Sequence, residues 1–252
     1  MTRYAPTLAV LLLTVSAALA QGPETTKSAA PGAPTTGSIP ASPAITANST
    51  PLELARAALA AQGGDKFKNL KSMVLIGSVD VYPPNSAQSV PGKFVMVTVG
   101  DKVRIDIDAL GMPHFRQIYD GQQSYSSIPG MQLPPASKFG LPVLAKFDQS
   151  GYTVSALPDK KKLRGFRIVD AEGNTTDFYI EPATGRVSQY LIPYHGFTFS
   201  TENSKFKEID GVLVPVNFTQ KLELLQQAYF AEYKVKDVKL NQPIGDDVFV
   251  MQ

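Results

Sequence analysis

Alternating apolar and polar residues run through much of the chain after residue 70 and predict β-strands. The segment KVRIDID at 102–108 is a clear case, because Val103, Ile105 and Ile107 alternate with charged residues. Successive side chains of a strand point to opposite faces of a sheet, so this pattern predicts one dry face and one wet face. Runs rich in β-branched and aromatic residues predict the other strands: 72–82, 93–99, 115–119, 122–127, 151–156, 163–170, 175–181, 186–192, 196–201, 205–209, 212–220, 227–239 and 246–250.

Short loops rich in glycine and aspartate separate these strands. Gly100-Asp101, Asp120-Gly121 and Asp210-Gly211 are typical of hairpin turns. Strands joined by such turns pair antiparallel. Because a sheet of about ten strands tends to curl or close, we expect one long, curved antiparallel sheet.

Two segments predict helices beside this sheet. The first begins after Thr50, which forms a capping box with Glu53 and precedes a proline at the first helical position. Gly63-Gly64 ends this helix. The second is SKFGLPVLAKF at 137–147, which follows a proline-rich break and predicts a short, interrupted apolar helix. Helices this short need a partner surface, so the fold class is mainly β with a few helices.

A curled sheet brings its apolar face around a common space. That space is either filled, as in an ordinary core, or left partly open for a ligand, and the composition does not decide between the two. In the second case the candidate ligand-binding residues are Met73, Leu75, Phe94, Met96, Ile105, Phe178, Ile180, Phe197, Tyr229 and Tyr233.

The N-terminal part of the chain predicts export. A positive start, the apolar run 8–17 and the small residues Ala18-Leu19-Ala20 are typical of a signal peptide over residues 1–20. The next residue is Gln21 and not cysteine, so we expect no lipid anchor there. Residues 21–50 are rich in Pro, Thr, Ser, Ala and Gly and predict a flexible linker. Residues 51–252 then form one domain.

Composition and motifs exclude several classes of function. The chain has no cysteine, which excludes thiolate catalysis and zinc–cysteine sites. Its 24 basic and 22 acidic residues are nearly balanced, unlike the basic surplus typical of nucleic-acid binders. His114 and His195 stand far apart without a third ligand, and no catalytic motif is present. We therefore expect no metal, no cofactor and no enzyme activity. The basic cluster at 160–164 predicts a solvated hairpin tip, or a docking patch for an acidic partner or lipid head group.

An ordered series of segments resembles the LolA/LolB-like lipoprotein carrier superfamily. It runs from NLKSMVLIGSV through DKVRIDI, IYDGQQSYS, FYIEPATGRVSQYLI and KEIDGVLVPVNF to VKLNQPIGDDVF, at 69–79, 101–107, 118–126, 178–192, 207–218 and 238–249. The resemblance covers nearly all of residues 51–252, although no single segment is specific. It implies an incomplete, half-open antiparallel β-barrel whose apolar concave face is lidded by helices.

The resemblance also implies site residues. The lid would comprise 52–62 and 137–147, with Phe139, Leu141, Leu144 and Phe147 as its apolar contacts. Arg104 matches the position at which the family carrier latches its lid. Alternation, however, puts Arg104 on the face opposite Val103, Ile105 and Ile107, where a surface arginine would pair with a neighbouring carboxylate. Both readings of Arg104 stay open.

The resulting hypothesis is a monomeric periplasmic carrier that binds acyl chains of lipoproteins or lipids in an apolar cavity and moves them between membranes. Its partners would be those chains and inner- or outer-membrane proteins, and not nucleic acid. One alternative is an envelope-stress sensor or interaction module of the same fold, for which the linker and the basic cluster would suit docking. Another is a secreted hydrolase whose site forms only in three dimensions.

Overall fold

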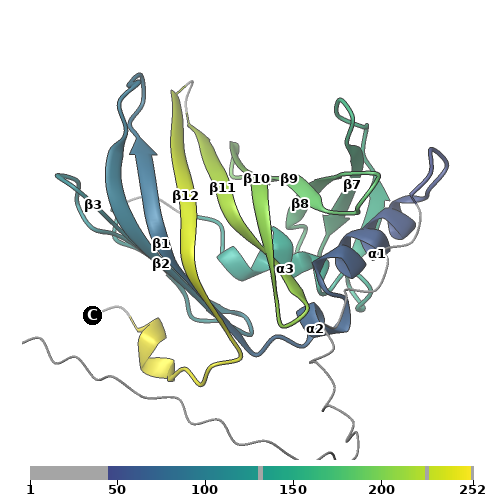
Figure 1. The fold of residues 1–252 in the computed structure, drawn as a ribbon, viewed down its shortest axis with the longest axis horizontal. Helices are drawn as coiled ribbons and strands as arrows, with labels where there is room; N and C mark the ends of the chain where they lie inside the picture. Colours follow the sequence, from purple (N-terminus) through teal and green to yellow (C-terminus); the bar gives the residue numbers. More distant parts are fainter. Residues whose placement is uncertain (1–44, 130–132, 225–226, 251–252) are drawn as a thin grey trace, which may run out of the picture. The chain divides into compact units, whose positions relative to one another are not determined.

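A single antiparallel sheet dominates the structure, a computed structural model that describes residues 45–129, 133–224 and 227–250 (Figure 1). The sheet contains twelve strands in the order β5-β4-β3-β2-β1-β12-β11-β10-β9-β8-β7-β6. The strands are β1 (Ser72–Tyr82), β2 (Val90–Val99), β3 (Lys102–Ala109), β4 (Phe115–Tyr119), β5 (Ser124–Ser126), β6 (Thr153–Ala156), β7 (Arg164–Val169), β8 (Thr175–Ile180), β9 (Val187–Tyr194), β10 (Phe197–Ile209), β11 (Val212–Leu224) and β12 (Gln227–Leu240).

The strand order leaves the sheet open. The chain enters at the middle of the sheet, and β1 to β5 run as a meander to one edge. The chain then crosses to the opposite edge, where β6 begins, and a second meander returns to β12. β12 pairs with β1 from Leu240 opposite Met73 to Phe230 opposite Tyr82. β5 and β6 are thus free edges, which confirms the prediction of an incomplete antiparallel barrel.

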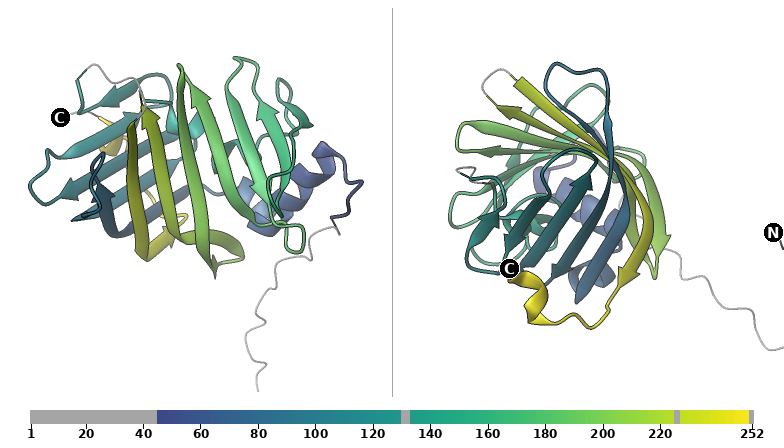
Figure 2. Two further views of the ribbon diagram at one scale, coloured as in Figure 1. Left: turned by 90° about the horizontal axis from the view of Figure 1, so that it is seen from above. Right: turned by 90° about the vertical axis from the view of Figure 1, so that its left-hand side faces the viewer.

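The sheet is strongly bent, and the helices α1 (Pro51–Gln62), α2 (Asp65–Lys68) and α3 (Leu141–Leu144) lie on its concave side (Figure 2). Register shifts at Ile76/Gly77 and between Asn203 and Phe206 interrupt the ladders of β1 with β12 and of β10 with β11. Such bulges increase the local twist of a strand. Gly77 is required at the first of them, because a Cβ atom there would lie 2.1 Å from the carbonyl oxygen of Lys234.

Helix α1 begins as predicted. The backbone N–H of Glu53 donates to the Thr50 hydroxyl over 3.3 Å, and the N–H of Thr50 donates to the Glu53 carboxylate over 2.7 Å. Gly63 ends the helix in the left-handed conformation, with φ of 118°. Leu54 of this helix is buried, whereas Leu52 is 38% exposed.

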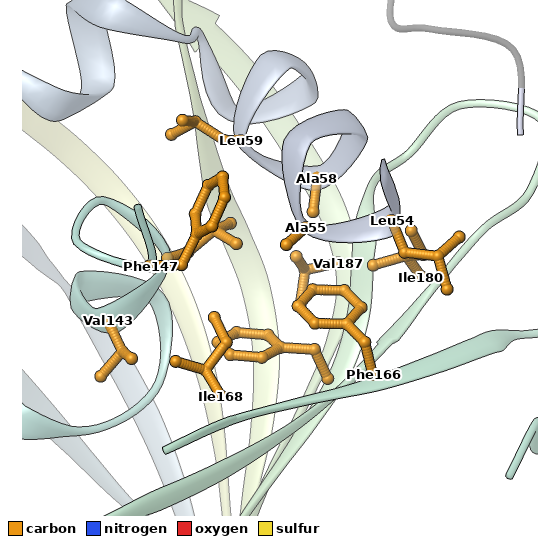
Figure 3. Packing of buried hydrophobic residues seen from close by; sticks show 12 residues of the cluster. Leu54, Ala55, Ala58, Leu59, Val143, Phe147, Phe166, Ile168, Ile180 and Val187 are labelled. Carbon is orange, nitrogen blue, oxygen red and sulfur yellow. The ribbon is translucent and has the colours of Figure 1, made fainter. Parts of the chain in front are cut away.

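The first core cluster lies where α1 and α3 pack on the strands β7 to β9 (Figure 3). Figure 3 shows Leu54 of α1 beside Ile180 of β8, Ala55 above Val187 of β9, and Leu59 toward Phe147. The rings of Phe166 and Phe178 stack with centroids 5.1 Å apart. This half of the concave side is therefore a filled core.

A second core cluster lies in the other half of the sheet. Phe94, Phe218 and Tyr233 come from β2, β11 and β12 and pack ring on ring, with Phe218 and Tyr233 stacked at 4.6 Å. They share the face of the sheet that carries the first cluster. We call this common, concave face the inner face.

A third cluster lies on the outer face, under the C-terminal segment. Val97 and Ile118 are covered there by Phe249, which belongs to the 3-10 helix η2 (Asp246–Phe249). The sequence predicted a strand at 246–250, and this prediction is wrong. In a strand Val248 and Phe249 would point to opposite sides, whereas both pack against this one cluster.

The N-terminal boundary of the folded part lies earlier than residue 51. Ile45 packs against the first core cluster, and Arg164 donates hydrogen bonds to the carbonyl oxygens of Thr46 and Ser49. Residues 45–50, which we assigned to the linker, are thus held against the domain. The predicted signal peptide and residues 21–44 of the linker lie outside the described residues.

Candidate functional site

The candidate ligand-binding residues all come from the inner face of the sheet. Residues directly opposite one another in a ladder share a face. Leu75 lies opposite Met96, which lies opposite Ile105. The same relation, followed from strand to strand, places the whole predicted set on the inner face: Met73, Leu75, Phe94, Met96, Ile105, Phe178, Ile180, Phe197, Tyr229 and Tyr233.

Burial divides this set into two groups. Leu75, Phe94, Phe178, Ile180 and Tyr233 are buried and belong to the two inner core clusters. Met73, Met96, Ile105 and Phe197 are half-buried, and Tyr229 is 39% exposed. Only the second group has side-chain surface left for a ligand, together with the half-buried Ile107, Ile192, Phe199 and Leu222 on the same face.

The predicted lid lies across the concave side, and we call residues 133–147 the cover segment. It contains η1 (Ala136–Lys138) and α3. Phe139, Leu144 and Phe147 are buried, and Leu141 packs against the first core cluster. These four side chains thus take part in apolar packing, and their role as a lid stays a prediction.

Polar contacts attach the cover segment to both halves of the sheet. The Gln117 amide of β4 donates to the carbonyl oxygen of Pro134 over 2.8 Å. The backbone N–H of Gly140 donates to the Thr176 hydroxyl of β8 over 3.1 Å. A Cβ atom on Gly140 would lie 2.8 Å from the Tyr190 ring, so only glycine fits there. The sequence analysis missed Gln117 and Thr176, because one polar residue within a strand carries no signal of a partner far along the chain.

One buried polar atom of the cover segment has no partner. The Ser137 hydroxyl is buried and makes no hydrogen bond with any described residue. An unsatisfied buried polar group costs about 1–3 kcal/mol. The closed arrangement of the cover segment therefore carries a local energetic cost.

A pocket of about 440 Å³ lies beside the cover segment. Its walls come from the β4–β5 hairpin, the cover segment and the turns that follow β7 and β9. The lining residues are Tyr119, Gln122, Ser124, Tyr125, Ser126, Leu133, Pro135, Lys138, Glu172, Asn174, Tyr194 and His195. This lining is mainly polar and aromatic, in contrast to the apolar inner face.

His195 has a structural role in one wall of this pocket. With Gly196 it forms the turn between β9 and β10, and both residues have positive φ, 49° and 81°. Two such residues in succession are typical of a type I′ hairpin turn. The His195 ring stacks on Tyr194 with centroids 4.2 Å apart. The His-Gly pair was the sequence signal for this turn.

Arg104 does not contact the cover segment, and its expected role as a lid latch is corrected here. It points to the outer face, where it pairs with Asp106 and donates to the Val248 carbonyl oxygen over 2.8 Å. Alternation along β3 is the reason, because Arg104 lies opposite Val97 of the outer cluster. The arginine therefore holds η2 and not the predicted lid.

Asp106 is the centre of an ionic cluster on this outer face. It accepts hydrogen bonds from Arg104, from Arg116 over 2.7 Å and from His114 over 3.0 Å. Partial burial by itself raises the pKa of Asp106, but these hydrogen bonds outweigh burial and lower the pKa from 3.8 to about 2. The cluster is thus a structural ion pair network beneath η2.

The candidate ligand-binding residues of the inner face carry no charge. Burial raises the pKa of Tyr190 and of Tyr233, so both phenols stay neutral at physiological pH. Among the described residues, no group of three or more His, Cys, Asp or Glu side chains could hold a metal ion. Within the same part of the chain, no helix has the length and apolar character needed to cross a membrane.

These features define an open, curved antiparallel sheet with a helical cover over an apolar concave face. No family model and no curated protein matches the chain. Among solved structures, it is similar to a LolA superfamily protein from Nitrosomonas europaea, with a TM-score of 0.52, 12% identity, and coverage of 78% of this chain and 97% of that chain. The chain therefore has a LolA-like fold.

Two further solved structures are similar to a lesser degree. One is a DUF1329 family protein from Desulfovibrio piger ATCC 29098, with a TM-score of 0.49 and 9% identity over 79% of this chain and 95% of that one. The other is a putative outer membrane lipoprotein-sorting protein domain from Vibrio parahaemolyticus, with a TM-score of 0.49 and 10% identity over 79% and 95% of the two chains.

Proposed function

We propose that this protein is a periplasmic carrier that binds acyl chains of lipoproteins or lipids on its inner face, without covalent chemistry. The observation that supports this most is the apolar surface left uncovered there. Beyond the region packed under α1 and α3, the inner face carries the half-buried side chains of Met96, Ile105, Ile107, Phe199 and Leu222. Apolar side chains gathered on a concave surface are typical of ligand-binding sites.

The energetics favour hydrocarbon as the occupant. Transfer of one methylene from water to an apolar environment is worth about 0.8 kcal/mol, so a chain of about 16 carbons would cost about 12 kcal/mol if left in water. Apolar side chains from neighbouring strands of one bent face can supply that environment. The candidate ligand-binding residues on that face are all uncharged, so none of them disfavours a hydrocarbon chain.

Release requires that binding is reversible, and the cover segment suits this. Besides its buried apolar side chains, separate polar contacts hold it, among them the hydrogen bonds at Gln117 and Thr176. The unpaired Ser137 hydroxyl lowers the stability of the closed arrangement. Movement of this segment would enlarge the space available to a chain.

Location in the periplasm is part of the proposal. It is supported by the signal-peptide pattern at residues 1–20, with Ala18-Leu19-Ala20 as the cleavage site.

A pair of neighbouring residues allows a sharp test. Tyr229 lies on the inner face and Phe230 on the outer face, and both are 39% exposed. We expect the full chain to take up palmitate in native mass spectrometry, and Tyr229→Ser to weaken the uptake several-fold, while Phe230→Ser leaves it unchanged. Equal effects of the two substitutions, or no uptake by the unsubstituted protein, would contradict the proposal.

A further inference from the structure

The pocket beside the cover segment has a lining whose charges are balanced. Among the lining residues, Lys138 is the one lysine and Glu172 the one carboxylate. The Lys138 ammonium donates to both carboxylate oxygens of Glu172 over 2.6 Å. The other lining side chains are hydroxyls, amides, aromatic rings and two apolar residues. A ligand with a single net charge would meet one favourable and one unfavourable partner in this pocket.

The Lys138–Glu172 ion pair is accessible to solvent, and a ligand can replace each partner of the pair. The two side chains are 29% and 65% exposed. An ion pair that is this exposed contributes little to stability, and both side chains are long and flexible. A ligand that brings one anionic and one cationic group can therefore separate the pair, because each of the two side chains then gains a new partner of opposite charge.

Other groups in the lining suit such a ligand. No hydrogen bond joins the side chains of Gln122, Ser124 or Tyr194 to another described residue. The Ser124 hydroxyl and the Gln122 amide can donate to oxygens of an anionic group. Tyr194, stacked with His195, offers an aromatic face of the kind that attracts an ammonium group.

The pocket shares a wall residue with the inner face. Tyr194 lines the pocket and is also an inner-face residue, since it lies opposite Phe197 in the ladder of β9 and β10. Its ring also meets Phe139 of the cover segment, edge to face at 5.6 Å. A lipid whose polar head occupied the pocket would thus have its chains beside the half-buried side chains of β9 and β10.

We propose that this pocket binds a zwitterionic head group composed of a phosphate ester and a primary ammonium, with the phosphate at Lys138 and the ammonium at Glu172. The same chemistry occurs in phosphatidylethanolamine and in its water-soluble head. The inference rests on the proposed function only for the placement of the chains.

The test is a titration of the full chain by calorimetry with dihexanoyl phosphatidylethanolamine, dihexanoyl phosphatidylglycerol and glycerophosphoethanolamine. We expect the ethanolamine lipid to bind about tenfold more tightly than the glycerol lipid. Glu172→Gln abolishes this preference. Lys146→Gln is the matched control, because Lys146 lies in the cover segment but pairs with Asp101 outside the lining. It leaves the preference intact.

The outcomes separate the two proposals. Equal affinity for the two lipids, or a preference that survives Glu172→Gln, overturns the head-group assignment and leaves the carrier function standing. Binding of glycerophosphoethanolamine with no gain from the hexanoyl chains supports the pocket and contradicts acyl binding on the inner face. No binding of any of the three probes overturns the head-group assignment, and the palmitate measurement then decides the carrier function by itself.

Discussion

At the scale of single residues, Asp106 shows how a strand position acquires a role that its own sequence context does not reveal. Alternation along β3 correctly assigned Arg104 and Asp106 to the face opposite Ile105. The sequence could not show that Arg116 and His114 would join them, because those residues arrive on β4 and in the turn before it. The resemblance suggested that Arg104 latches the lid. Arg104 lies on the outer face, however, and the cover segment lies on the inner side of the sheet.

Asp106 should make the protein sensitive to acid. The folded-state pKa of Asp106 is about 2, below the ordinary 3.8. The stabilisation that ionised Asp106 gives the folded state is therefore complete above about pH 4 and is lost as pH falls towards 2. A shift of this size corresponds to about 2 kcal/mol. We expect Asp106→Asn to flatten the dependence of unfolding free energy on pH in that interval, as measured by urea unfolding at a series of pH values. An unchanged slope between pH 4 and 2 would contradict this role.

At the scale of elements, the cover segment and η2 are the two pieces that attach to the sheet without joining its ladder. Phe139, Leu144 and Phe147 of the cover segment were foreseeable as apolar contacts. Its path over the concave side was not, since it depends on single polar contacts with β4 and β8. For η2, the β-branched and aromatic residues were misleading, because packing against the outer apolar cluster accompanies a 3-10 helix there.

The cover segment should open more readily when Thr176 loses its hydroxyl. Thr176→Val keeps the size of the side chain but leaves the buried N–H of Gly140 without an acceptor, at a cost of about 1–3 kcal/mol. Hydrogen exchange is expected to accelerate at residues 133–147 and to stay unchanged in α1. Uniform acceleration in both would show that the cover segment does not open separately.

The attachment of η2 should depend on Arg104 much more than on Lys102. Arg104 is half-buried and donates to both Asp106 and the Val248 carbonyl oxygen, whereas Lys102 pairs with an Asp246 side chain that is 83% exposed. We expect Arg104→Ala to lower the free energy of unfolding by about 2–3 kcal/mol and Lys102→Ala by less than about 1 kcal/mol. Urea unfolding measures both, and equal losses would refute the assignment.

At the scale of the whole molecule, the strands and their antiparallel pairing were predictable because local alternation and hairpin turns determine them. The strand order was not, because the chain crosses between the two edges and closes the middle of the sheet by pairing β1 with β12. The division of the inner face into buried and half-buried positions was also beyond the sequence. Phe178 and Met96 both lie in alternating strand sequence. Phe178 is buried because α1 and α3 pack over it, whereas Met96 lies away from these helices and is half-buried.

The β1–β12 closure should tolerate no side chain at Gly77. A Cβ atom there would lie 2.1 Å from the Lys234 carbonyl oxygen and 2.8 Å from the Phe94 ring. Overpacking of this kind costs about 1–3 kcal/mol or more, so Gly77→Ala should lower the thermal midpoint by several degrees. Gly100→Asn is the control, since asparagine accepts its positive φ and nothing lies within 4 Å. Similar midpoints for the two variants would contradict this role.

The most direct measurement is a crystal structure of the protein with a brominated fatty acid. The anomalous signal of bromine locates the chain without any assumption about its site. We expect bromine on the inner face, within van der Waals distance of Met96, Ile105 and Leu222, beside the cover segment. Bromine found only on the outer face, or an inner face without bound chain at saturating fatty acid, would contradict acyl carriage.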